Sequence, residues 1–276
     1  MCGRYVSTKS TSDLLEEFDA FDATSGEATE VDYNVAPTTQ VRTVLTRAPR
    51  EAVTEPTERK PLEPQPVETA DAAQPTVPLR QLRVARWGLV PSWAKDTSVG
   101  NRLFNARSES VPDKPAFARA FAKRRCLIPA DGWYEWQRET GPDGKPRKQP
   151  FLMVPRDGHS LALAGLYEFW RPKGAGAEVP ILLSVTILTT AAQGELAEIH
   201  DRMPLVLRRQ DWQRWLDPAV TVPSDLLLPH DEAADESLEL RPVSSKVNSV
   251  RNNSADLIEP IAHPAPGDQA QALELF

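Results

Sequence analysis

The sequence predicts a mixed α/β fold that is rich in β-strands and carries a few short helices. Short apolar runs with many β-branched residues recur along the chain, which is typical of strands. Apolar residues at helical spacing occur only in short stretches. The hydrophobic share of 40% is ordinary for a globular protein, and no internal repeat divides the 276 residues. We therefore expect a single domain over residues 2–260.

The expected elements follow one another as short strands with helices between them. We expect residues 2–6 to form a strand. Leu14 and Phe18 fall at helical spacing after Thr11 or Ser12, either of which can cap a helix. Further strands are expected at residues 41–45, 82–90, 125–130, 132–136, 151–154, 161–166 and 180–188. Further helices are expected at 115–123, 191–199 and 211–216, and turns at 33–37 and 141–144.

Two segments lack the pattern of a packed structure. Residues 48–78 are rich in Pro, Glu, Thr and Gln and carry almost no large apolar side chain, so they cannot bury enough surface to become ordered. We expect a flexible insertion there. Residues 261–276 are rich in Ala, Pro and Gln, and we expect a loose C-terminal tail.

The charge is distributed unevenly along the chain. The net charge is −7, and residues 13–32 hold eight acidic side chains and no Lys or Arg. Residues 217–240 likewise hold seven acidic side chains and no Lys or Arg. Residues 79–125 are the reverse, with eleven Lys and Arg against three acidic residues. This asymmetry permits an anionic partner for the central region, and a solvated basic face is the alternative.

Several kinds of site and partner are not expected. No run of about 18 apolar residues exists, and the N-terminus lacks the layout of a secretory signal. We expect a cytoplasmic protein, associated with the nucleoid if bacterial, without a membrane partner. Cys2 and Cys126 are too few for a disulfide framework or a paired zinc spacing. We expect no metal, no cofactor and a monomer. Cys126 has apolar neighbours and is expected to be buried and structural.

Cys2 has the chemistry of an N-terminal aminothiol. Removal of Met1 leaves an α-amine and a thiol on the same residue. The amine has an ordinary pKa of about 7.7–8.0, so its neutral fraction can attack an aldehyde and form an imine. The adjacent thiol then closes onto the imine carbon as a five-membered thiazolidine. The alternative is that a cysteine at the second position is incidental.

Other side chains suit such a reaction. His200 can shuttle protons near neutral pH, and Glu135 shares a strand face with Trp133, where aromatic surroundings should raise its pKa. Asn105 and Arg107 stand two apart, so an extended segment holds both toward one sugar and phosphate. Each residue also has a structural alternative. His200 can have its hydrogen bonds satisfied within the protein, and Glu135 can pair with an arginine at a strand edge. Asn105 and Arg107 can belong to a turn.

Asn34 and four tryptophans are candidates for DNA contact. Asn34 can act as Asn105 does, or it can supply turn chemistry. The tryptophans fit platforms for unpaired bases, and they fit a β-core equally well. They are Trp87, Trp93, Trp133 and Trp136.

Six short motifs follow one another along the chain. They are residues 1–5 (MCGRY), 33–37 (YNVAP), 87–94 (WGLVPSWA), 105–109 (NARSE), 125–136 (RCLIPADGWYEW) and 199–204 (IHDRMP). Together they resemble the SOS response-associated peptidase (SRAP) family, a group regarded as forming DNA–protein crosslinks. The resemblance covers residues 2–260 and implies a β-barrel-like core, flanking short helices and a positively charged cleft for single-stranded DNA.

The resemblance also implies roles for individual residues. Cys2 matches the crosslinking residue, Asn105 the residue that holds the opened sugar, and Glu135 the catalytic acid. His200 matches the histidine that helps ring opening and crosslink reversal. Phosphate-binding and cleft positions are matched by Arg4, Arg107, Arg202, Trp87 and Trp136.

The expected function is binding of single-stranded DNA and covalent crosslinking to abasic sites through a Cys2 thiazolidine, which shields the lesion during the DNA damage response. This interpretation makes the protein an abasic-site processing enzyme with lyase-like reversal and an autopeptidase activity on Met1. Replication-fork proteins are then further partners. The alternatives are a cysteine peptidase or amidohydrolase of the N-terminal nucleophile type, and a non-catalytic binder of single-stranded DNA.

Overall fold

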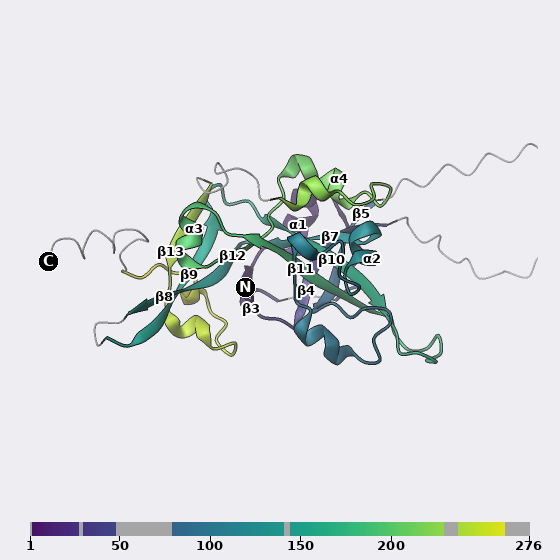
Figure 1. The fold of residues 1–276 in the computed structure, drawn as a ribbon, viewed down its shortest axis with the longest axis horizontal. Coiled ribbons are helices and arrows are strands. Elements are labelled where there is room, and N and C mark those ends of the chain that lie inside the picture. The colour runs from purple at the N-terminus through teal and green to yellow at the C-terminus, as the bar shows by residue number, and fades with distance from the viewer. Residues whose placement is uncertain (1, 28–29, 48–78, 141–143, 229–236, 263–276) are drawn as a thin grey trace, which may run out of the picture.

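The computed structural model describes residues 2–27, 30–47, 79–140, 144–228 and 237–262 and confirms a β-rich, mixed α/β fold with a few short helices (Figure 1). The strands are β1 (Tyr5–Ser7), β2 (Phe21–Asp22), β3 (Asp32–Val35), β4 (Gln40–Arg47), β5 (Leu79–Trp87), β6 (Asn105–Arg107), β7 (Arg125–Ala130), β8 (Gly132–Thr140), β9 (Pro146–Pro155), β10 (Leu161–Trp170), β11 (Leu182–Ala191), β12 (Arg202–Pro204) and β13 (Leu238–Pro242). The α-helices are α1 (Thr11–Phe18), α2 (Ala118–Lys123), α3 (Gly194–Ile199) and α4 (Trp212–Leu216). None of the described helices has the length and apolar character needed to cross a membrane.

Five of the described strands close into a barrel, which confirms the barrel-like core that the family resemblance implies. β11, β10, β7, β4 and β5 pair in this order, each antiparallel to the next. The ring closes where β5 runs parallel to β11, with Arg86 opposite Ser184 and Trp87 opposite Val185. Closure pairs backbone groups that an open sheet would leave at its edges.

A second sheet of five described strands lies beside the barrel, in the order β13, β9, β8, β1, β3. Its strand β1 is paired on both edges, because Tyr5 is opposite both Val35 on β3 and Trp133 on β8. In Figure 1, β8, β9 and β13 lie on one side of the molecule, the barrel strands lie on the other, and β3 lies between them. The N-terminal strand therefore runs along the junction of the two sheets.

Alternation along the barrel strands separates a packed interior from an outer face. On β7, Cys126 and Ile128 belong to the interior cluster, while Leu127 belongs to the cluster under the helices. Gly165 on β10 is required by this packing, because a Cβ there would lie 2.2 Å from Ile128 Cδ1. The interior cluster also contains Cys2, so the barrel core and the N-terminal residue form one packed unit.

The N-terminus of α1 differs from the expectation. Ser10 is the cap, because its hydroxyl accepts the Asp13 N–H while the Asp13 carboxylate accepts the Ser10 N–H. The predicted caps, Thr11 and Ser12, are wrong. The reciprocal arrangement needs an acidic side chain three residues after the cap, and only Ser10 has Asp13 at that distance.

The turn expected at residues 33–37 is also wrong over its first half. Asp32–Val35 form β3, which is held in extended form by pairing with β1. A neighbouring strand thus overrides the local turn preference of the YNVAP motif.

Other element bounds shift for local reasons. β5 ends at Trp87 because Gly88 adopts a φ of +129°, which breaks the strand. Helix α3 begins at Gly194 because β11 continues to Ala191. The expected insertion at 48–78 and the end of the expected tail, from 263, lie outside the described residues, as do residues 141–143 of the expected turn.

Candidate functional site

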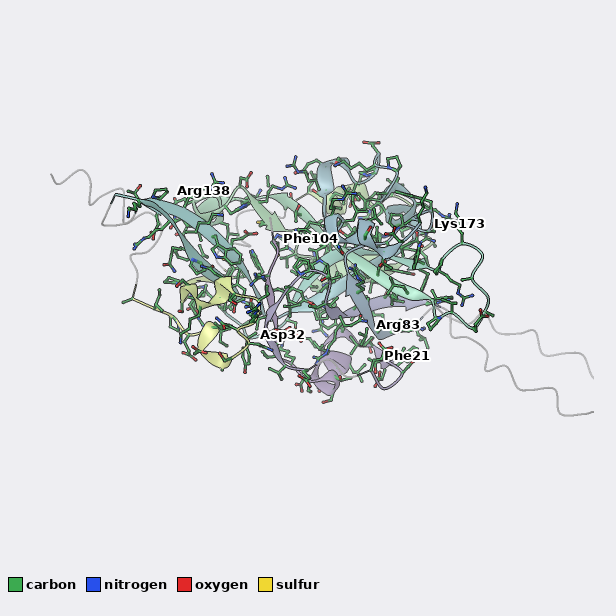
Figure 2. The ribbon with its side chains drawn as sticks, turned by 90° about the horizontal axis from the view of Figure 1, so that it is seen from below. Phe21, Asp32, Arg83, Phe104, Arg138 and Lys173 are labelled. Atoms are coloured by element: carbon green, nitrogen blue, oxygen red, sulfur yellow. The ribbon has the colours of Figure 1, made fainter. Side chains whose placement is uncertain are left out.

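Cys2 lies where the two sheets meet, and its side chain is fully buried. The ring of Tyr5 packs edge-on against Trp87, with 5.4 Å between ring centroids. The Cys2 carbonyl oxygen accepts a 2.6 Å hydrogen bond from Asn105 Nδ2. Figure 2 shows Phe104, the residue before Asn105, near the middle of the molecule. A side chain at the start of β6 therefore holds the backbone of Cys2 in place.

Strand β6 presents Asn105 and Arg107 on one face, as their spacing predicts. They lie opposite Ile187 and Thr189 of β11, and Ala106 between them is buried. Asn105 Oδ1 is buried and has no hydrogen-bond partner among the described residues. A buried acceptor without a donor lowers the stability of the folded protein by about 1–3 kcal/mol. A ligand that donates a hydrogen bond to this oxygen therefore binds more favourably. Arg107 is exposed, next to this acceptor along the strand.

Glu135 is a buried carboxyl on β8, with 3% of its surface exposed. Its neighbours on the same strand face include Trp133, and its cross-strand partner is Phe151. Burial raises the pKa of Glu135 to about 7, and the carboxylate of Asp201 contributes in the same direction. The sequence-based expectation of a raised pKa thus agrees with the structure. Near neutral pH this carboxyl can both donate and accept a proton.

The thiol of Cys2 stays protonated at neutral pH. Burial raises its pKa well above the ordinary value, and the negative charge of Glu135 raises it further. The pairing of β1 with β8 brings these residues to the same region, because Tyr134, which precedes Glu135, donates its N–H to the Arg4 carbonyl oxygen at 3.0 Å. A cysteine that attacks as a thiolate needs the opposite, a lowered pKa. The environment therefore suits a thiol that reacts after another group has begun the chemistry.

His200 follows α3 directly and faces the same region. Its Nδ1 lies 3.0 Å from the backbone nitrogen of Arg202 and 3.0 Å from Asp201 Oδ1. Burial lowers the pKa of His200, so the ring is neutral at physiological pH. Gln137, two residues after Glu135, donates a 3.2 Å hydrogen bond from Nε2 to the Glu198 carbonyl oxygen. This bond joins the strand of Glu135 to the helix that precedes His200.

Arg4 and Asn34 form a brace around the N-terminal strand. Arg4 Nη1 donates to Asn34 Oδ1 at 2.7 Å and to the Val247 carbonyl oxygen at 2.8 Å. The buried Asn34 Nδ2 lies within hydrogen-bond distance of the carbonyl oxygens of Val247, Ser249 and Asn252. The predicted DNA contact of Asn34 does not fit this arrangement, because its amide is used inside the protein. A phosphate contact by Arg4 stays a prediction.

The tryptophans differ in what they can offer to a base. Trp87 is fully buried and donates from Nε1 to the Phe104 carbonyl oxygen at 2.8 Å. Its predicted stacking on DNA is wrong, because no face of the ring is exposed. Trp136 is half-buried and donates to Asn248 Oδ1 at 2.6 Å, and its DNA contact stays a prediction. Trp93 is 55% exposed.

Arg202 is paired within the protein. Its Nη1 lies 2.5 Å from Glu109 Oε1, and its Nη2 lies 3.0 Å from Glu109 Oε2. The sequence interpretation missed Glu109, although it ends the motif that holds Asn105 and Arg107. An acidic residue two positions from a predicted phosphate ligand was the available signal. The phosphate contact of Arg202 stays a prediction.

Three hydrogen bonds connect the surroundings of the four predicted catalytic residues. Asn105 donates to Cys2, Tyr134 beside Glu135 donates to Arg4, and Gln137 on the strand of Glu135 donates to the helix that precedes His200. The roles of the four residues stay predictions. Within the described parts of the chain, no three His, Cys, Asp or Glu side chains are arranged to hold a metal ion.

Comparison with known proteins gives one consistent result. The model of the family described as SOS response associated peptidase (SRAP) matches residues 1–250. Two Bacillus subtilis relatives named abasic site processing proteins, YoaM and YoqW, are 34% and 35% identical to this chain. These matches cover 95% and 94% of this chain and 100% and 99% of the relatives. The Gallus gallus abasic site processing protein HMCES is 33% identical over 68% of this chain and 60% of its own length.

Solved structures agree on the fold. A protein of Bacteroides thetaiotaomicron has a TM-score of 0.72 at 19% identity, covering 95% of this chain and 100% of its own. A protein of Bordetella bronchiseptica has a TM-score of 0.61 at 25% identity, covering 88% of this chain and 100% of its own.

Proposed function

The chain belongs to the SOS response-associated peptidase family, and we propose that it captures abasic sites in single-stranded DNA by a covalent bond to Cys2. Its relatives YoaM, YoqW and HMCES are named abasic site processing proteins, which supports an abasic site as the substrate. The observation that carries the proposal is the surroundings of Cys2. Its carbonyl is fixed by Asn105, and the strand that pairs with the N-terminal strand carries Glu135, a buried carboxyl with a pKa of about 7.

The chemistry follows from the two groups of Cys2 after Met1 is removed. The abasic deoxyribose opens to an aldehyde when a proton reaches its ring oxygen and the C1′ hydroxyl loses one. The neutral amine of Cys2 adds to C1′ and gives a carbinolamine. Glu135 in its acid form protonates the hydroxyl, which leaves as water, and the imine forms. The thiol sulfur then bonds to C1′ and its proton moves to nitrogen, so aldehyde and aminothiol become thiazolidine and water.

Neighbouring side chains supply position and protons. The buried Asn105 Oδ1 is an acceptor for a hydroxyl of the opened sugar. Neutral His200 can pass a proton to the ring oxygen during opening, and the same groups run the steps backwards during reversal. The exposed Arg107 can pair with a phosphate beside the lesion. Because the lesion lacks a base, we expect little sequence preference and a marked dependence on salt.

The protonated thiol favours this proposal over a peptidase or amidohydrolase. In such enzymes the cysteine attacks as a thiolate, whereas burial and Glu135 both raise the pKa of the Cys2 thiol. In the crosslinking route the amine attacks first. The thiol adds afterwards as a neutral group, so its raised pKa is no obstacle. Removal of Met1 by the protein itself is part of the proposal, and the intact mass shows whether Met1 is absent.

The test is incubation of the purified full chain with a single-stranded oligonucleotide that carries one abasic site. We expect a protein–DNA band that survives denaturation and a mass equal to protein plus oligonucleotide minus one water. The Cys2→Ala variant should give no such band. Cys126→Ala is the matched control, because it removes the other buried thiol and should leave the band unchanged.

Two outcomes contradict the proposal. One is the absence of a stable band with a wild-type chain that lacks Met1. The other is a band of equal intensity with Cys2→Ala. Binding that disappears at high salt and survives Cys2→Ser, without covalent product, would identify a non-catalytic binder of single-stranded DNA instead.

A further inference from the structure

We propose that Glu109 is a positioning residue for this reaction, and that it acts through Arg202 to fix the orientation and tautomer of His200. The inference rests on the proposed function for its effect on catalysis. The structural claim is that Glu109, Arg202 and His200 are linked, a connection that the sequence did not predict. Each link between them is a hydrogen bond or an ion pair in the described residues.

The first link is the ion pair between Glu109 and Arg202. Both terminal nitrogens of the guanidinium are engaged by the two carboxylate oxygens, at 2.5 and 3.0 Å. Such a bidentate pair fixes the plane of the guanidinium as well as its position. The Arg202 side chain is only 12% exposed, whereas that of Glu109 is 53% exposed. The pair therefore reaches from the surface to a nearly buried group.

The second link ties the pair to the barrel. Arg202 Nη2 also donates to the Thr189 carbonyl oxygen at 2.6 Å. Thr189 lies on β11 opposite Arg107 of β6, and Ala191 of the same strand lies opposite Arg202. β6 and β12 pair with different edges of β11. The ion pair joins Glu109, which follows β6, to Arg202 on β12, so it crosses β11 and holds β6 and β12 in one register. It thus connects the strand of Asn105 to the turn that carries His200.

The third link is the backbone of Arg202. Its N–H donates to His200 Nδ1 over 3.0 Å, which is shorter than the 3.3 Å between Nδ1 and the Arg202 carbonyl oxygen, an acceptor that a protonated Nδ1 would use. A neutral imidazole that accepts at Nδ1 must carry its proton on Nε2. With Arg202 held in place, His200 therefore presents an N–H to the site and can give a proton to the sugar. If Arg202 moved, Nδ1 could instead carry the proton and donate to Asp201 Oδ1, which also lies 3.0 Å away.

The contacts of Arg202 also distinguish positioning by Glu109 from a role of Arg202 as a phosphate ligand. Each terminal nitrogen already has an acceptor, and Nε is buried without a partner among the described residues. If Arg202 were a phosphate ligand that Glu109 restrains, removal of the Glu109 charge would free it and tighten DNA binding. If Glu109 positions Arg202, the same change weakens the reaction and leaves DNA binding nearly unchanged. The two roles predict effects on different quantities.

The experiment compares the full-length wild type with Glu109→Gln. Asp225→Asn is the matched control, because Arg214 and Asp225 form a second bidentate pair at the surface. Three quantities are measured. They are the single-turnover crosslinking rate, the affinity for an oligonucleotide with a tetrahydrofuran abasic analogue that has no aldehyde, and the His200 tautomer from ¹⁵N–¹H side-chain NMR of the free protein.

We expect Glu109→Gln to lower the crosslinking rate about tenfold or more, as loss of proton-donor alignment does. Affinity for the analogue should change less than about twofold, since both terminal nitrogens of Arg202 are engaged within the protein and the change adds or removes no phosphate contact. The Nε2–H tautomer of the wild type should give way to a mixture of tautomers. Asp225→Asn should match the wild type in all three measurements, and equal melting temperatures exclude a folding defect.

An unchanged tautomer or an undiminished crosslinking rate in Glu109→Gln overturns the inference. A rate that stays the same while analogue affinity rises identifies Arg202 as a restrained phosphate ligand. If the wild type forms no crosslink, the proposed function fails, and the tautomer alone decides the structural part. The two failures are therefore distinguishable.

Discussion

Cys2 and Cys126 share their burial and differ in everything around it. Both side chains are fully buried, and burial raises the pKa of both thiols. Cys126 sits in the barrel wall between Leu127 and Arg125, and its sulfur faces the space that Gly165 leaves open. Cys2 lies at the junction of the sheets, near the ionisable Glu135.

Burial alone therefore does not decide whether a thiol is inert. Cys126 has no charged group among the causes of its shifted pKa, which is burial alone. Its expected structural role agrees with this packing. Cys2 is buried beside a carboxyl that exchanges protons near neutral pH, and its backbone is fixed by Asn105.

The largest effect should come from blocking the amine of Cys2 while keeping its thiol. A variant with one glycine inserted between Met1 and Cys2 turns the amine into an amide, which cannot form an imine. We expect crosslinking to fall by about 100-fold or more, as when a covalent nucleophile is lost. The measurement is the denaturation-resistant band, with binding to the tetrahydrofuran analogue as the control for DNA affinity. A band of normal intensity would mean that the thiol alone forms the bond.

The next effect should come from Glu135→Gln, which keeps the shape of the side chain and removes its acid. We expect the crosslinking rate at neutral pH to fall by about 100-fold, the lower end of the usual contribution of a general acid. The wild-type rate should rise up to about pH 7 as the Cys2 amine loses its proton, and it should decline above about pH 8, where the amine is already neutral and Glu135 has lost its proton. Glu135→Gln should lose this decline. A single-turnover rate profile from about pH 6 to 9 checks both statements, and an unchanged profile would assign the proton donor to another group.

The same raised pKa has a cost in stability. The folded state keeps the Glu135 proton between the ordinary pKa of 4.5 and about 7, whereas the unfolded state has released it. Stability attributable to this group therefore falls as pH rises through that window. Glu135→Gln should be more stable than the wild type above pH 7 by an amount on the order of 3 kcal/mol, and the gain should vanish near pH 4. Denaturant unfolding at the two pH values measures it, and a pH-independent difference would contradict it.

Cys126→Ala should affect stability and leave the chemistry unchanged. Loss of a fully buried sulfur from the barrel wall costs about 1–2 kcal/mol through the small cavity that remains. Thermal unfolding should show a lower melting temperature than the wild type. The crosslinking rate per folded molecule should stay the same. A loss of crosslinking by a Cys126→Ala variant that is as stable as the wild type would show that Cys126 takes part in the reaction.

The smallest effect should come from Arg107→Ala at the rim of the site. Removing one phosphate contact should lower DNA affinity a few-fold and reduce the salt slope by about 0.7, the value for one contact on a single strand. Titrations of the tetrahydrofuran oligonucleotide at several salt concentrations measure the slope. The bound-state crosslinking rate should change little. An unchanged slope would mean that Arg107 does not contact a phosphate.

Sequence patterns within a single strand predict the bounds of some strands and which of their side chains share a face. The bounds of β7, Arg125–Ala130, agree with the expectation, because a continuous apolar run buried on both faces has few alternatives. The shared face of Trp133 and Glu135 follows from strand alternation, and the raised pKa of Glu135 follows from that face. Asn105 and Arg107 are placed correctly for the same reason.

Contacts between distant residues were not predictable in this way. Closure of the barrel pairs Trp87 with Val185, and no pattern within either strand specifies the partner. The same holds for Glu109 and Arg202, which are 93 residues apart. Trp87 has the residue type of a base-stacking platform, and only the tertiary structure shows that its ring is enclosed. Residue type and spacing therefore identify candidates, while burial and pairing decide their roles.

The brace between Arg4 and Val247 joins residues 243 positions apart, which sets the order in which the molecule can be completed during translation. A chain that emerges from the ribosome N-terminus first presents Cys2 long before the carbonyl that anchors Arg4 has been made. Val247 must therefore be synthesised before the N-terminal strand acquires this anchor. The brace spans a sequence separation of 243 residues, so the surroundings of the aminothiol are completed by one of the least local contacts of the fold.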